Sequence, residues 1–121
     1  NTALGEKALY SNTTGQNNTA SGARAMESNT TGGYNTATGS YALNANTTGS
    51  DNTAFGNGAM QANTTGGNNT GVGSEALYAN TTGLRNSAFG HKALYANTTG
   101  SKVFNAVSSV SIPQFLAFTK Q

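Results

Sequence analysis

One short unit repeats along most of this chain, and the repeat limits the possible fold more than any other feature. Units of 17 residues begin at six asparagines: Asn1, Asn18, Asn35, Asn52, Asn69 and Asn86. Aligned, the six units read N-T-A-x-G-x-x-A-L-x-x-N-T-T-G-x-x and fill residues 1–102. A fixed period of this kind is typical of architectures in which each unit packs mainly on its neighbours. The sequence therefore predicts six similar coils stacked in one row.

Seven positions carry the same residue in all six units: Asn at position one, Gly at five, Ala at eight and the block N-T-T-G at twelve to fifteen. Position nine is always Leu or Met, whereas position four ranges from Ser to Phe. We expect the core to consist of position nine, two alanines and position four. The expected core residues at position nine are Leu9, Met26, Leu43, Met60, Leu77 and Leu94.

The residue types of the unit favour β-structure over helix. Its two glycines, three threonines and two asparagines would each cost several tenths of a kcal/mol in a helix relative to Ala. A β-solenoid instead uses short strands and places Gly at bends that need an unusual φ or a close backbone approach. We expect an all-β, parallel β-solenoid (β-roll) of six 17-residue coils, with one strand at positions two to four and a second around positions eight to fourteen.

Two columns of glycines mark the expected bends. The corner glycines at position five are Gly5, Gly22, Gly39, Gly56, Gly73 and Gly90. Those at position fifteen are Gly15, Gly32, Gly49, Gly66, Gly83 and Gly100. Neighbouring positions accept Glu, Lys, His and Tyr, so side-chain bulk is tolerated one residue away. A demand of the backbone itself explains this contrast.

Identical residues form columns when parallel coils stack about 4.7–4.9 Å apart. A side-chain amide both donates and accepts, so a column of asparagines can satisfy itself along the stack. The predicted structural ladder at position twelve is Asn12, Asn29, Asn46, Asn63, Asn80 and Asn97. We expect a second ladder at position one.

The core of such a coil is thin. Hydrophobic residues make up only 35% of the chain, and alanine is the most frequent of them. One large side chain and two methyl groups per coil offset little of the ordering entropy of 17 residues. Oligomerisation would bury a second face. We therefore expect a homotrimer in which position four or nine faces the three-fold axis, with Phe55 and Phe89 in the interface.

Residues that could carry chemistry are few and scattered. The four acids, Glu6, Glu27, Asp51 and Glu75, occupy four different positions of the unit, and the single histidine, His91, falls at a variable one. There is no cysteine, and the Gly-rich stretch 67–73 lacks the G-K-[ST] of a phosphate loop. We expect no enzyme, no catalytic or metal site and no cofactor.

The charge and hydropathy patterns argue against binding to nucleic acid and against insertion into a membrane. A net charge of +2 over 121 residues provides no basic face for nucleic acid. No apolar run approaches the roughly 18 residues of a membrane-spanning helix, so we expect no membrane insertion.

Three features of the unit leave a functional surface open. Tyr10, Tyr78 and Tyr95 share position ten, where they either contact a receptor or glycan or pack on one another. Threonine columns can order water, but Thr13 and Thr14 are adjacent and would point to opposite faces of a strand. A T-x-T pair on one face is not expected. The N-T-T sequons are potential glycosylation sites in a secretory host.

Units such as N-T-A-L-G-E-K-A-L and N-S-A-F-G-H-K-A-L resemble the head repeats of trimeric autotransporter adhesins of the YadA type. The longer form with N-T-T-G is similar to repeats in tail-fibre proteins of bacteriophages, large viruses and some bacteria. This resemblance covers residues 1–102 and implies a left-handed parallel β-roll in which three chains form a rigid stalk or head. The period of 17 departs from the shorter unit of the adhesins.

The composition changes after Lys102, so we divide the chain into a β-solenoid shaft, 1–102, and a segment, 103–121, that is a C-terminal cap or a junction strand leading to a further domain. Val107, Val110 and Ile112 suggest a short strand there. The following P-Q-F-L-A-F resembles the first strand of tumour-necrosis-factor-like jelly rolls. Because the chain opens inside a repeat, we expect it to be part of a longer protein.

Taken together, the sequence favours a structural and adhesive shaft of an extracellular trimeric fibre. The fibre would lie on a cell surface or a virion and present a domain that binds a host-cell receptor, a glycan or a surface. The alternative is a self-assembling filament or an ice-binding β-solenoid, in which the surface of the repeats is itself functional.

Overall fold

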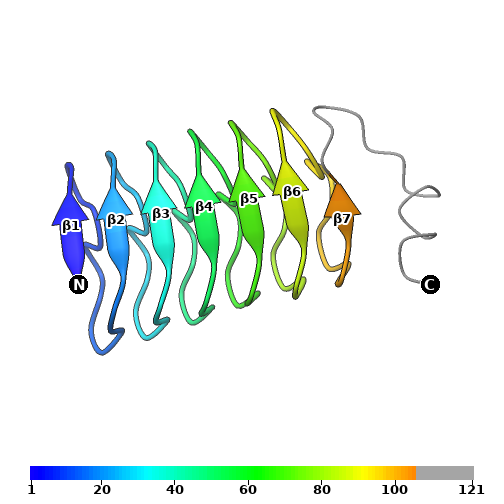
Figure 1. The fold of residues 1–121 in the computed structure, drawn as a ribbon. Coiled ribbons are helices and arrows are strands. Elements are labelled where there is room, and N and C mark those ends of the chain that lie inside the picture. The colour runs from blue at the N-terminus through cyan, green and yellow to red at the C-terminus, as the bar shows by residue number, and fades with distance from the viewer. Residues whose placement is uncertain (106–121) are drawn as a thin grey trace.

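The computed structural model describes residues 1–105 and forms a parallel β-solenoid, which confirms the expected fold class (Figure 1). Each coil contributes one strand at positions two to four of the unit. These strands are β1 (Thr2–Leu4), β2 (Thr19–Ser21), β3 (Thr36–Thr38), β4 (Thr53–Phe55), β5 (Thr70–Val72) and β6 (Ser87–Phe89). A short strand, β7 (Phe104–Asn105), follows them.

The seven strands form one parallel sheet in sequence order, β1 to β7. Each residue pairs with its equivalent one unit later, so Ala3 lies opposite Ala20 and Ala20 opposite Ala37. The sheet continues through Phe104–Asn105, past the composition change at residue 102. The strand suggested for residues 107–112 and the P-Q-F-L-A-F motif lie outside the described residues.

The second strand expected around positions eight to fourteen does not form. A series of tight turns takes its place: the Ala8 N–H donates to the Gly5 carbonyl at 3.2 Å and the Tyr10 N–H to the Lys7 carbonyl at 3.2 Å. Lys7 and Leu9 have φ of 60° and 55°. A positive φ is incompatible with a strand, because it turns the chain where a strand extends it.

Side chains in each strand alternate between the inside and the outside of the coil. The middle residue, such as Ala37 or Ala54, is fully buried, as are Leu43 and Met60 of position nine. Position four instead faces outward, with Phe55 56% exposed. Position four is therefore not part of the coil core, and position nine is not free to face another chain.

Backbone hydrogen bonds join each coil to the next around its whole circumference. In the second to fifth coils one carbonyl has four donors: the Thr64 carbonyl, for example, accepts the N–H groups of Thr47, Thr48 and Gly49 at 2.9–3.3 Å. The Thr47 hydroxyl donates to the same oxygen at 3.2 Å. This bond recurs at position thirteen in five coils and accounts for the hydroxyl group there.

Gly71 replaces the inward-facing alanine of the other five units, and we expect Gly71→Ala to stabilise the fold by about 0.4–1 kcal/mol. An added Cβ would lie 3.1 Å from Cγ of Met60, a flexible side chain, and 3.2 Å from the Ala76 carbonyl. Urea unfolding measures the change. Gly73→Ala is the contrast, because Gly73 has φ +128° and should lose stability instead. A loss of stability in Gly71→Ala would show that Met60 cannot yield.

Candidate functional site

The asparagines at position twelve form a continuous side-chain ladder inside the solenoid. Each Nδ2 donates to the Oδ1 one coil earlier: Asn46 to Asn29 at 2.7 Å and Asn63 to Asn46 at 2.8 Å. The same Nδ2 of Asn46 also donates to the Gly49 carbonyl at 3.0 Å. Asn29, Asn46, Asn63 and Asn80 are fully buried. The ladder therefore serves the fold rather than a ligand.

The asparagines at position one do not form the second side-chain ladder that the sequence suggested. The Oδ1 of Asn18 accepts the backbone N–H of Asn35 at 2.9 Å, and its Nδ2 donates to the Gly32 carbonyl at 2.8 Å. These side chains bond to backbone because position one lies just before the strand. The backbone N–H of position one in the next coil has no carbonyl partner there, and the asparagine Oδ1 accepts it. Within residues 1–105, no buried polar side-chain atom lacks a hydrogen-bond partner.

This burial bears on the N-T-T sequons. The amide nitrogens of Asn29, Asn46, Asn63 and Asn80 are enclosed and hydrogen-bonded, so the folded coil offers them to no modifying enzyme. Thr14 and its equivalents in the other five coils are exposed.

The two columns of corner glycines are required for different reasons. The glycines at position five have φ between 123° and 140°, and a Cβ on Gly39 would lie 2.6 Å from the carbonyl carbon of Gly56. At position fifteen no positive φ is involved. There, a Cβ on Gly32 would overlap the carbonyl oxygen of Gly49 in the next coil and would lie 2.7 Å from Oδ1 of Asn29. Both columns are demanded by coil stacking.

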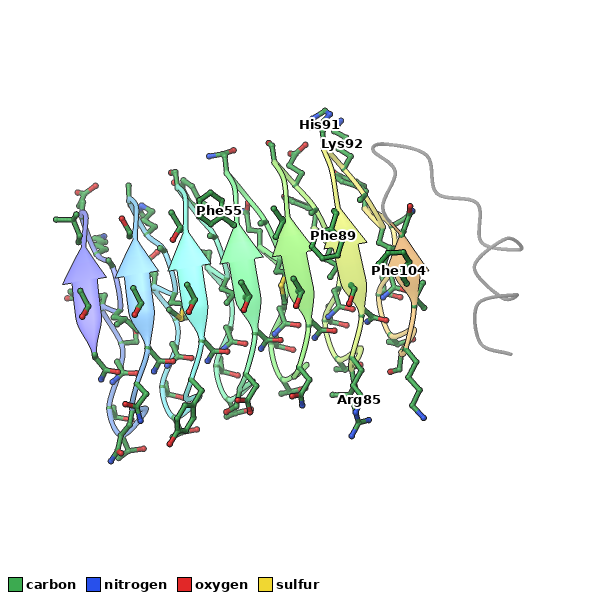
Figure 2. The ribbon with its side chains drawn as sticks, in the orientation of Figure 1. Phe55, Arg85, Phe89, His91, Lys92 and Phe104 are labelled. Carbon is green, nitrogen blue, oxygen red and sulfur yellow. The ribbon has the colours of Figure 1, made fainter. Side chains whose placement is uncertain are left out.

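The outer face of the sheet, which we call the strand face, consists of positions two and four. In the six coils, position two is Thr or Ser and position four is Leu, Ser, Thr, Phe or Val, so neither column contains a charge. Phe55, Phe89 and Phe104 are 56%, 39% and 52% exposed on it. The rings of Phe89 and Phe104 lie 6.2 Å apart and tilted by 55°. Figure 2 shows these three side chains along the C-terminal part of the sheet.

The tyrosines at position ten behave differently from one another. Tyr78 and Tyr95 stack with ring centres 5.0 Å apart and an angle of 7°. Nζ of Lys92 lies 5.4 Å from the Tyr95 ring centre and 3.8 Å from a carboxylate oxygen of Glu75. Tyr10 is 73% exposed. The pair thus packs along its column, whereas Tyr10 presents its ring to solvent.

The charged side chains do not converge. Arg24 and Glu27 pair at 3.3 Å, and His91 is exposed. Arg85 lies at the opposite end of the coil from His91 and Lys92 (Figure 2). Within the described residues no three His, Cys, Asp or Glu side chains are close enough to hold a metal ion. No helix in the same part of the chain is long and apolar enough to cross a membrane.

The expectation that the adjacent threonines at positions thirteen and fourteen point to opposite faces of a strand is wrong. Positions thirteen and fourteen lie in a bend, and Thr47 is partly exposed while Thr48 is exposed. They do not alternate across a sheet, because this segment is not a strand. On the strand face, Thr36 and Thr38 form one T-x-T pair, so the expectation that no such pair occurs is wrong.

These features define the chain as a parallel β-solenoid repeat protein with an internal asparagine ladder and an uncharged strand face. No protein-family model, curated protein or solved structure matches it.

Proposed function

We propose that this chain is the structural shaft of an extracellular homotrimeric fibre, on a cell surface or a virion, that carries an adhesive domain. The observation that supports this most is the repeat itself: stacked coils are joined by backbone hydrogen bonds around the coil and by a buried asparagine ladder. Such a body is rigid along its axis and can be lengthened one unit at a time. The receptor, glycan or surface would be bound by the domain that the shaft presents.

Association in threes is supported by the thin core and the exposed strand face. Each coil buries one Leu or Met and at most two alanines, which is little for its length. Phe55 and Phe89 stay accessible, although monomeric proteins rarely leave apolar side chains clustered in solvent. Position four is the available interface, because position nine is enclosed.

A shaft should tolerate changes in length by whole units. We expect deletion of residues 35–68, two complete units, to leave a folded oligomer whose length is reduced by about 9.5 Å, twice the inter-strand spacing. Small-angle X-ray scattering measures the length and analytical ultracentrifugation the mass. Deletion of residues 35–42 breaks the period and serves as the control, which should unfold the neighbouring coils. A monomeric wild-type chain, or equal damage by both deletions, would contradict the proposal.

A second candidate function is ice binding by the threonine surface. It is favoured by the exposed threonines at position fourteen, which recur at every coil, and by the hydroxyls at position thirteen that are fixed to the backbone. A rigid array of methyl and hydroxyl groups repeating about every 4.8 Å can hold ordered water.

Ice affinity would decide between the two functions. An ice-binding solenoid should show thermal hysteresis that is lost on replacing Thr48 and Thr65 by tyrosine, with Thr53→Tyr on the strand face as the control. For a shaft we expect no hysteresis in the wild-type chain.

A further inference from the structure

Asn57 differs from every other asparagine of the chain in the residue that follows it. Of the 17 asparagines, Asn57 alone precedes a glycine, Gly58, whereas 12 precede Thr or Ser. Asn57 occupies position six of the fourth coil, outside both asparagine columns, and it is exposed. His91, at the same position of the sixth coil, lies at one end of its coil (Figure 2). Water therefore reaches the Asn57 side chain.

An asparagine followed by glycine can lose its side-chain amide without an enzyme. The backbone nitrogen of the following residue gives up its proton and attacks Cγ of the asparagine. A new C–N bond closes a five-membered succinimide ring, and the side-chain nitrogen takes up a proton and leaves as ammonia. Glycine permits this attack best, because it has no Cβ to obstruct the approach. A following threonine, which is branched at Cβ, obstructs it.

We propose that Asn57–Gly58 is a site of spontaneous deamidation, and that local opening of the fourth coil sets the rate of the reaction. Water opens the succinimide once it has formed. Addition of water to the side-chain carbonyl gives aspartate, whereas addition to the main-chain carbonyl gives isoaspartate, in which the chain continues through Cγ. The net reaction consumes one water and releases one ammonia. It needs no other reactant and does not depend on the oligomeric state proposed above.

The folded coil holds both nitrogens that take part in the reaction. The Gly58 N–H donates to the Ser40 carbonyl at 2.9 Å, and Nδ2 of Asn57 donates to the same oxygen at 3.2 Å. Because the Gly58 proton is held in this bond, the nitrogen loses it only after the bond breaks. Gly58 is also buried, with side-chain atoms of Gln61 and Glu75 next to it. The reaction therefore starts from a locally opened coil and is slower than in the unfolded chain.

Isoaspartate at residue 57 would disturb the contacts of the fourth coil with both of its neighbours. The Asn57 carbonyl accepts the Glu75 N–H of the fifth coil at 2.9 Å, whereas the Gly58 N–H bonds to Ser40 of the third coil. Isoaspartate turns this carbonyl into a carboxylate beside the chain and adds one backbone atom before Gly58. Since each coil packs mainly on its neighbours, the damage falls in the middle of the solenoid.

Peptide mass spectrometry of the folded chain identifies the reacting asparagine by the exchange of NH2 for OH. Incubation in mildly alkaline buffer continues until the first asparagine has reacted. We expect this to be Asn57, and we expect Asn17 and Asn68, which are also exposed but precede Asn, to react at least about 10-fold more slowly. Asn57→Gln is the control, because its longer side chain would have to close a six-membered ring. A first reaction at any other asparagine overturns the proposal.

The control of the rate by the fold is tested on the same residue pair. We expect deamidation of Asn57 to be at least about 10-fold faster in the urea-unfolded chain than in the folded one. Gly56→Ala leaves Asn57–Gly58 unchanged but places a Cβ 2.6 Å from the carbonyl carbon of Gly73. This variant should react faster than the folded wild type, and at the rate of the urea-unfolded chain if it does not fold. Equal rates in folded and unfolded wild type, or in wild type and Gly56→Ala, overturn the control by coil opening.

Hydrogen exchange measures the effect of the product on the fold. The isoaspartate form is separated by ion exchange and identified by enzymatic methylation of its free carboxylate. We expect faster exchange at the amides of Gly58 and Glu75 in this form than in the unmodified chain. Freshly prepared Asn57→Asp is the control, because it has the same charge on an unaltered backbone and should exchange like wild type. Unchanged exchange in the isoaspartate form, or equal acceleration in Asn57→Asp, overturns the proposed effect on the coil.

Discussion

Replacing Gly56 by valine is expected to lower the free energy of unfolding by about 3–5 kcal/mol, from backbone strain and overpacking together. Gly56 has φ +138°, a conformation that side chains with a Cβ rarely adopt. Its added Cβ would lie 2.6 Å from the carbonyl carbon and oxygen of Gly73, which are backbone atoms of the next coil and cannot rotate away. Thermal and urea unfolding followed by circular dichroism measure the loss.

The control is Asn57→Val, one residue further along the chain. Asn57 is exposed, and its side chain makes one hydrogen bond, from Nδ2 to the Ser40 carbonyl at 3.2 Å. The same valine there should change stability by less than about 1 kcal/mol. Hydrogen exchange should place the damage of Gly56→Val in its own coil and the two neighbouring coils. Equal melting of both variants and wild type would refute the assignment of the corner.

The repeat made the coil length, the strand at positions two to four and the buried Leu or Met predictable. Recurrence within one chain reveals that a residue is constrained, but not what constrains it. Asn35 illustrates this. The sequence shows that its position is always Asn, but not that its Nδ2 donates to the Gly49 carbonyl, 14 residues away, or that its Oδ1 accepts the Asn52 N–H, 17 residues away.

The largest difference from the sequence-based expectation is the series of turns that replaces the second strand. No residue type in this segment indicates those turns. Gly and Asn are the usual residues at positive φ, but position nine holds Leu or Met at 50–55°, and position seven holds Arg24 and Tyr41 at 61° and 64°. These conformations are held by bonds to neighbouring coils, such as the Arg24 N–H to the Glu6 carbonyl at 2.8 Å. Tertiary contacts override local preference here.

The outward direction of position four was predictable in principle. Ala37 is buried in the middle of a three-residue strand, so alternation places both flanking residues outside. The phenylalanines at position four suggested burial by their chemistry. The structure shows that position nine alone supplies the large buried side chain of each of the six coils.

Replacing one amide of the asparagine ladder by a carboxylate should also cause a large loss of stability. Asn46→Asp keeps the shape of the side chain but replaces Nδ2, which donates to Oδ1 of Asn29 at 2.7 Å and to the Gly49 carbonyl at 3.0 Å. An oxygen there faces two acceptors in a fully buried site. We expect a loss of about 3–5 kcal/mol at pH 7, the range found for uncompensated buried charges.

The loss should depend on pH in a defined direction. Burial and the two facing acceptors, Oδ1 of Asn29 and the Gly49 carbonyl, disfavour the charged form, so they raise the pKa of the introduced carboxyl above its unfolded value of about 3.9. The native state then binds the proton more tightly than the unfolded state. Stability is therefore regained as pH falls through the native pKa. The pH-dependent part of the loss is fully recovered below the unfolded pKa. Asn68→Asp makes the same exchange at an exposed position and should track wild type at every pH. Equal stability of the two aspartate variants at pH 7 would mean that position twelve is not an interior ladder.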